Sequence, residues 1–235
     1  VRQLLKRYCH YRTLYSDINS GGEYVTRLAT FQFRFKAMPG HLGYDPVGAD
    51  ITAAGTPYWF ASPTYINYFK GAYTGWRGSI RWKFLPTSNN IASMAVHRVE
   101  TDANREAVSD GRAIISTSTA PASSYSAYAQ KGVVKASGSL AGTAATMNRT
   151  MDSLEAEIPY ALPIRFSACQ GDYLPAGENT IFSSYPGGNA FHLTLNTNTE
   201  GAYVVYDTYV AAGEDFTLFG FVGAPVMFSA PTPSP

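Results

Sequence analysis

Apolar and polar side chains alternate in several short segments, and this period of two constrains the fold more than any other feature. In residues 30–36, Phe31, Phe33 and Phe35 occupy every second position. Successive side chains of a β-strand point to opposite faces of a sheet, so the three rings share one buried face. The same alternation predicts strands at residues 78–85, 153–160 and 190–196.

Other segments have the composition of strands without a clear alternation. We predict a strand at residues 92–99 and weaker ones near 113–117 and 133–136, between long loops. Residues 202–210 and 216–222 are apolar on both faces, which is typical of strands that are covered on both sides.

Two short helices are also predicted. Residues 1–8 carry apolar side chains at i, i+3, i+4 and i+7, and Ser62 with Pro63 resembles a helix cap followed by a first-turn proline. The second helix would place Tyr65, Ile66, Phe69 and Tyr73 on its apolar side.

About eight strands, two short helices and long loops favour an all-β, antiparallel two-sheet sandwich. No repeat or second domain is evident, so residues 1–235 are expected to form one domain. It would carry an amino-terminal arm at residues 1–25 and a proline-rich tail at residues 226–235. The expected core comprises Phe31, Phe33, Phe35, Ile80, Trp82, Phe84, Leu154, Ile158, Leu193 and Leu218.

The composition indicates a subunit of an assembly. Only 15% of the residues are charged, whereas the chain contains 17 Tyr and 13 Phe. A domain of this size cannot bury all of those rings internally, and tyrosine suits half-buried contact surfaces. Large exposed aromatic patches are therefore expected, with residues 124–128 (Tyr125 and Tyr128 among them) and the terminal arms as likely contributors to contacts.

Nothing in the sequence indicates an enzyme, a metal site or a cofactor. Glu155 and Glu157 share a strand face, where carboxylates more often serve as surface or interface charges than as a catalytic pair. The four histidines, His10, His41, His97 and His192, are dispersed without a metal-binding motif. Cys9 and Cys169 are expected to be reduced, and no segment is long and apolar enough to span a membrane.

Four segments resemble the C-terminal capsid protein of dicistroviruses and of related marine algal RNA viruses, all of them picorna-like viruses. The segments are VRQLLKRY at residues 1–8, YTGWRGSIRW at 73–82, LEAEIPY at 154–160 and AAGEDFTLFGFVGAP at 211–225. They are similar to that family's LRQLLKR, GWRGSMRW, LEVEIPY and AGDDFSLFFFLGAP, in the same order. No such segment is recognised in residues 101–150. The family has an Asp-Asp-Phe motif, linked to autocleavage of a precursor, on one of its capsid proteins, and this chain has no Asp-Asp-Phe. Glu214-Asp215-Phe216 lies in the last of the four segments, and no cleavage role is inferred for it.

The resemblance implies an eight-stranded jelly roll and a structural role in a non-enveloped virion. In that family, sixty copies each of three related proteins form a pseudo-T=3 icosahedral shell around positive-sense single-stranded RNA. The protein would then be a polyprotein product that surrounds the fivefold axis, assembles in the host cytoplasm and resides in the virion. Its partners would be the other capsid proteins and the genomic RNA, with an unknown host receptor and no insertion into a membrane.

The basic opening segment has two interpretations. Arg2, Lys6, Arg7 and Arg12 would either neutralise RNA phosphates on the inner side of the shell or pair with acidic groups of neighbouring subunits. Two other classes of protein share the expected fold. These are a lectin-like carbohydrate-binding module, which the aromatic content permits, and a cupin-type enzyme, which would need clustered metal ligands.

Overall fold

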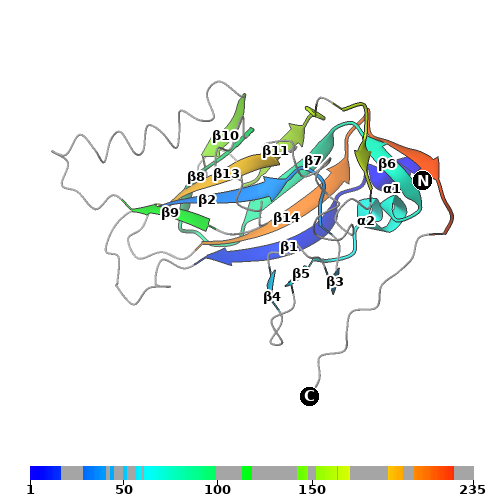
Figure 1. Cartoon of the computed structure of the whole chain (residues 1–235). Coiled ribbons are helices and arrows are strands. Elements are labelled where there is room, and N and C mark those ends of the chain that lie inside the picture. Colours follow the sequence, from blue (N-terminus) through cyan, green and yellow to red (C-terminus); the bar gives the residue numbers. More distant parts are fainter. Residues whose placement is uncertain are drawn as a thin grey trace, which may run out of the picture.

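A computed structural model describes residues 1–16, 29–40, 43–44, 50–51, 57–59, 61–98, 113–117, 142–147, 152–162, 164–169, 190–197 and 204–224. Two antiparallel sheets dominate this part of the chain (Figure 1). The first has the order β1 (Cys9–Ser16), β14 (Val204–Ala212), β7 (Ile80–Pro86) and β11 (Leu154–Ile158). The second has the order β10 (Thr143–Met147), β8 (Ile91–Arg98), β13 (Ala190–Thr197), β2 (Ala29–Lys36) and β9 (Ala113–Thr117).

The strand pairing is that of one long hairpin rolled into two layers. β1 pairs with β14, β2 with β13, β7 with β11 and β8 with β10, so that the pairs are nested along the chain. Rolling brings β14 against β7 and β13 against β8, which completes both four-stranded sheets. This is the jelly-roll arrangement, and it confirms the predicted eight-stranded sandwich. β9 adds a fifth strand beside β2.

Aromatic rings fill the space between the two sheets. Trp82 of the first sheet lies 5.6 Å from both Phe35 and Phe191 of the second, measured between ring centroids. The alternation of each strand turns these side chains inward, as the sequence predicted. Eight of the ten expected core residues are buried, Leu218 is partly buried against the core, and the side chain of Phe31 lies outside the described residues.

Two smaller sheets and two helices complete the described structure. One sheet has the order β12 (Ser167–Ala168), β6 (Tyr73–Arg77) and β15 (Thr217–Phe221). The other has the order β3 (Gly43–Tyr44), β5 (Pro57–Trp59) and β4 (Asp50–Ile51). The helices α1 (Arg2–Leu5) and α2 (Tyr65–Lys70) lie with β6 at one end of the sandwich (Figure 1). Neither helix has the length or apolar character of a membrane span, a statement that holds for the described residues.

Several local expectations differ from the structure. Thr64, and not Ser62, caps α2, because the Thr64 hydroxyl accepts a hydrogen bond from the Asn67 backbone at 3.2 Å. Tyr73 belongs to β6 and not to the helix.

Three other expectations stay predictions because they lie outside the described residues. They are the strand at 133–136, the contacts of Tyr125 and Tyr128, and the tail at 226–235.

β15 departs most from the expectation. Its sequence predicted a strand covered on both faces, yet Thr217, Phe219, Gly220 and Phe221 are exposed and only Leu218 is partly buried. β15 also lies outside the sandwich, at the edge of the small sheet formed with β6. Nothing in the described chain covers its outer face.

Candidate assembly site: a polar network and an aromatic face

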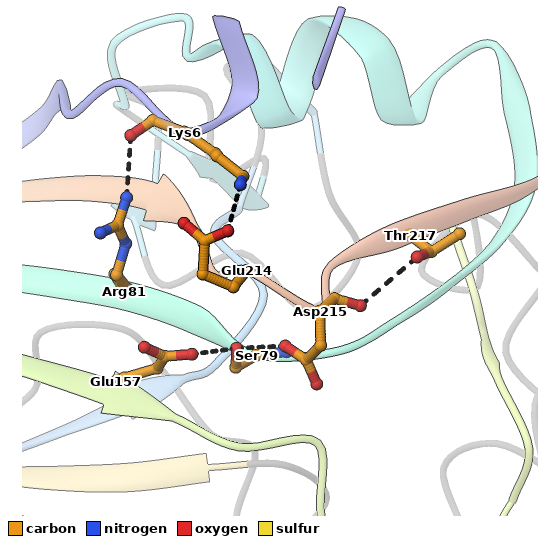
Figure 2. A network of polar contacts seen from close by, with 7 residues as sticks. All are labelled: Lys6, Ser79, Arg81, Glu157, Glu214, Asp215 and Thr217. Carbon is orange, nitrogen blue, oxygen red and sulfur yellow. Dashed lines mark hydrogen bonds and ion pairs between the residues drawn. The ribbon is translucent and has the colours of Figure 1, made fainter. Parts of the chain in front are cut away.

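A network of charged groups joins the first residues of the chain to the sandwich. Lys6 forms an ion pair with Glu214, which follows β14, and Arg81 Nη2 of β7 donates to the Lys6 carbonyl oxygen at 2.9 Å (Figure 2). The hydrogen bond from Lys6 lowers the pKa of Glu214 below its ordinary value. The contacts of Lys6 therefore hold the end of α1 beside two strands of the first sheet.

Ser79 lies at the centre of the same network, which we call the Ser79 network (Lys6, Ser79, Arg81, Glu157, Glu214 and Asp215). Its hydroxyl contacts both Glu157 and Asp215, and its backbone N–H donates to Asp215 Oδ1 at 2.7 Å (Figure 2). These hydrogen bonds from Ser79 lower the pKa of Asp215. One short turn thus connects β7, β11 and the segment between β14 and β15.

Further contacts extend the network across the outer face of the first sheet. The Arg81 guanidinium lies 5.4 Å from the centre of the Tyr8 ring, and Lys83 pairs with Glu155 at 2.9 Å. Burial, with Glu155 nearby, raises the pKa of Tyr8. Glu155 and Glu157 do share a face of β11, as predicted, and each is held by a neighbouring side chain of its own subunit.

The four basic residues singled out in the sequence do not form one cluster. Arg2 and Arg7 are exposed, whereas Lys6 is engaged by Glu214 and Arg12 lies in β1 with its side chain half-buried. The backbone of Arg12 is fixed by Thr208, whose hydroxyl donates to the Arg12 carbonyl at 2.7 Å. Only Arg2 and Arg7 therefore remain as exposed cations of this set.

The structure brings together two histidines that the sequence treated as dispersed. His97 of β8 and His192 of β13 are register partners, and their ring centroids lie 5.3 Å apart. Burial lowers the pKa of His97, which favours its neutral form. No group of three or more potential metal ligands occurs within the described residues.

Exposed aromatic side chains collect on the outer side of the small β12–β6–β15 sheet. Phe166, Phe219 and Phe221 are 52%, 40% and 70% exposed. Phe221 packs edge-on against Tyr73 with centroids 5.5 Å apart, and Phe166 lies 6.1 Å from Phe219. We call these four residues the aromatic face.

A glycine allows the aromatic face to form. A Cβ added at Gly75 would lie 2.6 Å from Cδ2 of Phe166, so the ring lies directly on the backbone of β6. Gly75 is also the register partner of Phe219. The composition predicted exposed aromatic patches but not this location, because the rings come from segments that are far apart in the sequence. The apolar character of residues 216–222 was the only local signal.

Replacing Ser79 with alanine should lower the free energy of unfolding by about 1–2 kcal/mol, because two carboxylates lose a hydrogen-bond donor. The pKa of Asp215 is lowered in the folded state. Its stabilising effect is therefore present above the unfolded carboxyl pKa of about 3.9 and is lost as the pH falls through the lower folded value. Urea unfolding of the wild type and of Ser79→Ala at several pH values should show a difference in the free energy of unfolding that becomes smaller in acid.

Ser88 provides the matched control for this substitution. Its hydroxyl accepts a hydrogen bond from the Val205 backbone at 3.3 Å and interacts with no carboxylate in the described residues. Ser88→Ala should change the stability by a similar amount at every pH tested. A Ser79→Ala effect that is equally independent of pH would contradict the role assigned to Asp215.

Three comparisons place the chain among known proteins. The model of a family described as "CRPV capsid protein like" matches residues 1–232. Among curated proteins, none is detectably similar to the chain. Solved structures provide the third comparison, and all of those described next come from viruses.

The chain is similar to a protein in the structure of a marine algae virus of the order Picornavirales. The two are 24% identical with a TM-score of 0.69, over 97% of this chain and 83% of that one. It also resembles a chain of deformed wing virus, at 16% identity and a TM-score of 0.59, over 99% and 87% of the respective chains. A chain of sacbrood virus of honeybee is 16% identical with a TM-score of 0.57, over 97% and 95%. At these identities the structural likeness establishes the shared fold.

Proposed function

The chain belongs to the family of CRPV-like capsid proteins, and on this premise we propose how it contributes to a virion. As a capsid protein it is a structural subunit of an icosahedral picorna-like virus. We propose that sixty copies combine with related capsid proteins in a pseudo-T=3 shell around positive-sense single-stranded RNA. Assembly in the host cytoplasm and a purely structural, non-enzymatic role belong to the same proposal.

The observation that carries the proposal is the family match, which runs over residues 1–232 and therefore includes every strand of the jelly roll. The family match does not favour the lectin-like alternative. The composition and the surface support the proposal independently. Only 15% of the residues are charged, and the described chain exposes large apolar rings, which mark sites of contact with other proteins.

Two roles are open to Arg2 and Arg7, the exposed cations of the opening segment. In one, they neutralise RNA phosphates without reading bases; in the other, they pair with acidic groups of a neighbouring subunit. Lys6 is better suited to holding α1 in place, because Glu214 of the same chain already engages it.

Assembly tests the proposal. When the chain is produced together with the other capsid proteins of its virus, sedimentation should show rapidly moving particles that contain this chain. Their ratio of absorbance at 260 nm to that at 280 nm reports packaged RNA.

If Arg2 and Arg7 face the RNA, changing both to glutamine should lower the RNA content of particles that still form. If they pair with a neighbouring subunit, particle yield should fall instead. A wild-type chain that remains a monomer beside its companions would contradict the proposal.

A further inference from the structure

The sequence of β15 suits a covered strand, but its outer face is open in the single chain. Phe219 and Phe221 follow the strand alternation onto one face, and Val222 beyond them is 71% exposed. Such a concentration of large apolar side chains is unusual on the surface of a monomer and marks interaction sites. The mismatch between sequence and exposure indicates that something outside the chain covers this strand.

The side chains of the aromatic face are held in place by strand register and packing. The strand register places Phe219 opposite Gly75 and Phe221 opposite Tyr73. Because Gly75 has no side chain, the ring of Phe166 can lie directly on the backbone there. On the inner side of the same sheet, Trp76 is buried and stacks on Phe216 with centroids 6.1 Å apart. The exposed rings are therefore attached to a rigid base, so that binding would cost little ordering of side chains.

Two arginines lie beside the exposed rings. Arg77 ends β6 opposite Thr217, and Arg165 directly precedes Phe166; both side chains are exposed. The Arg77 guanidinium lies 5.9 Å from the centre of the Tyr160 ring, and its charge contributes, after the hydrogen bonds from Ser79, to the lowered pKa of Asp215. Neither arginine is within ion-pair distance of a carboxylate in the described residues. Aromatic residues with arginine are the composition that protein–protein interfaces favour.

Five of the six acidic side chains that the structure describes are poorly placed to supply a carboxylate to those arginines in a second copy; the sixth, Asp152, is exposed. Glu214 pairs with Lys6, Glu155 with Lys83, and Glu157 and Asp215 both contact Ser79. Asp207 accepts a hydrogen bond from the Thr13 hydroxyl at 2.5 Å. These five carboxylates already serve their own subunit, which favours a partner of different sequence as the source of the carboxylate.

We propose that the aromatic face binds a segment of a different capsid chain, one that presents apolar side chains and at least one carboxylate to Arg77 and Arg165. The inference rests on the proposed function and adds the location and chemistry of one contact. Single-stranded RNA fits less well, because two arginines beside exposed phenylalanines provide few cations for a chain of phosphates.

A charged substitution in the centre of the face tests the proposal. Phe221→Asp should lower the yield of particles at limiting subunit concentration by about thirtyfold, the factor expected when one interfacial hot-spot ring is lost. Met147→Asp on β10 is the matched control, since Met147 is 65% exposed and lies outside the aromatic face. The control should assemble like the wild type, and both variants should keep the circular dichroism spectrum of a β-protein. Wild-type yield from folded Phe221→Asp would overturn the proposal.

A crosslinking experiment identifies the occupant without relying on an altered yield. A photoreactive phenylalanine analogue at position 221, irradiated in assembled particles, should crosslink to a peptide of a companion capsid chain that contains a carboxylate. Crosslinks to RNA, to a second copy of this chain or to no partner would overturn the inference. The proposed function would survive any of those results, because it fails only if the wild-type chain does not enter particles at all.

Discussion

Replacing Trp82 with alanine should lower the free energy of unfolding by about 3–5 kcal/mol, the range measured when a large core ring is removed. Trp82 is fully buried between the sheets and packs against Tyr11, Phe35 and Phe191 at centroid distances of 5.3–5.6 Å. No neighbouring side chain can fill the vacated volume without leaving its own position in the sandwich. Urea unfolding of the isolated chain at low concentration measures the loss.

Trp82→Phe separates the packing of this residue from its hydrogen bond. The indole Nε1 donates to the Ala37 carbonyl at 3.0 Å, and phenylalanine keeps much of the ring while removing that donor. The substitution should cost less than the alanine change, with about 1–3 kcal/mol of its effect due to the unsatisfied carbonyl. Equal losses for the two variants would show that the hydrogen bond, and not the packed ring, dominates.

Gly78→Ala should destabilise the chain by more than about 3 kcal/mol, because it combines backbone strain with a clash that the neighbouring atoms cannot relieve. Gly78 has a φ of +108°, and an added Cβ would collide with the Asp215 carbonyl oxygen. It would also lie 2.6 Å from Phe216 Cα, which is backbone and cannot rotate away. The turn that carries Ser79 would have to move away from Asp215 and Phe216, which directly precede β15.

Two other glycines separate the contributions to that loss. Gly142 has a φ of +81° with open space at its Cβ position, so Gly142→Ala should cost only about 1–2 kcal/mol for strain. Gly223 has neither a positive φ nor a close neighbour, and Gly223→Ala should be nearly neutral. If Gly78→Ala costs no more than Gly142→Ala, the close approach of the two turns is not a constraint.

The sequence was sufficient to predict the strands whose alternation is regular. Residues 30–36 and 190–196 became β2 and β13, paired so that Phe35 stands opposite Phe191. β1 was missed because its register shifts between His10 and Arg12, which breaks the period of two. β10 was missed because its residues, TAATM, carry little apolar bulk to alternate.

The candidate site was less predictable than the fold. Ser79 meets Asp215 across 136 positions and Glu157 across 78, and no local pattern encodes contacts that the topology creates. The sequence grouped the basic residues at the start of the chain, but the structure does not bring them into one cluster. The sequence could not reveal that Lys6 turns to Glu214 while Arg2 and Arg7 stay exposed.

Electron cryomicroscopy of particles that contain this chain tests the central claim most directly. We expect a closed icosahedral shell in which this chain recurs sixty times as a jelly roll with the β1–β14–β7–β11 and β10–β8–β13–β2 sheets. The aromatic face should then lie against a companion chain. A particle without this chain in its shell, or a chain that forms only monomers and small oligomers beside its companions, would show that the protein is not a capsid subunit.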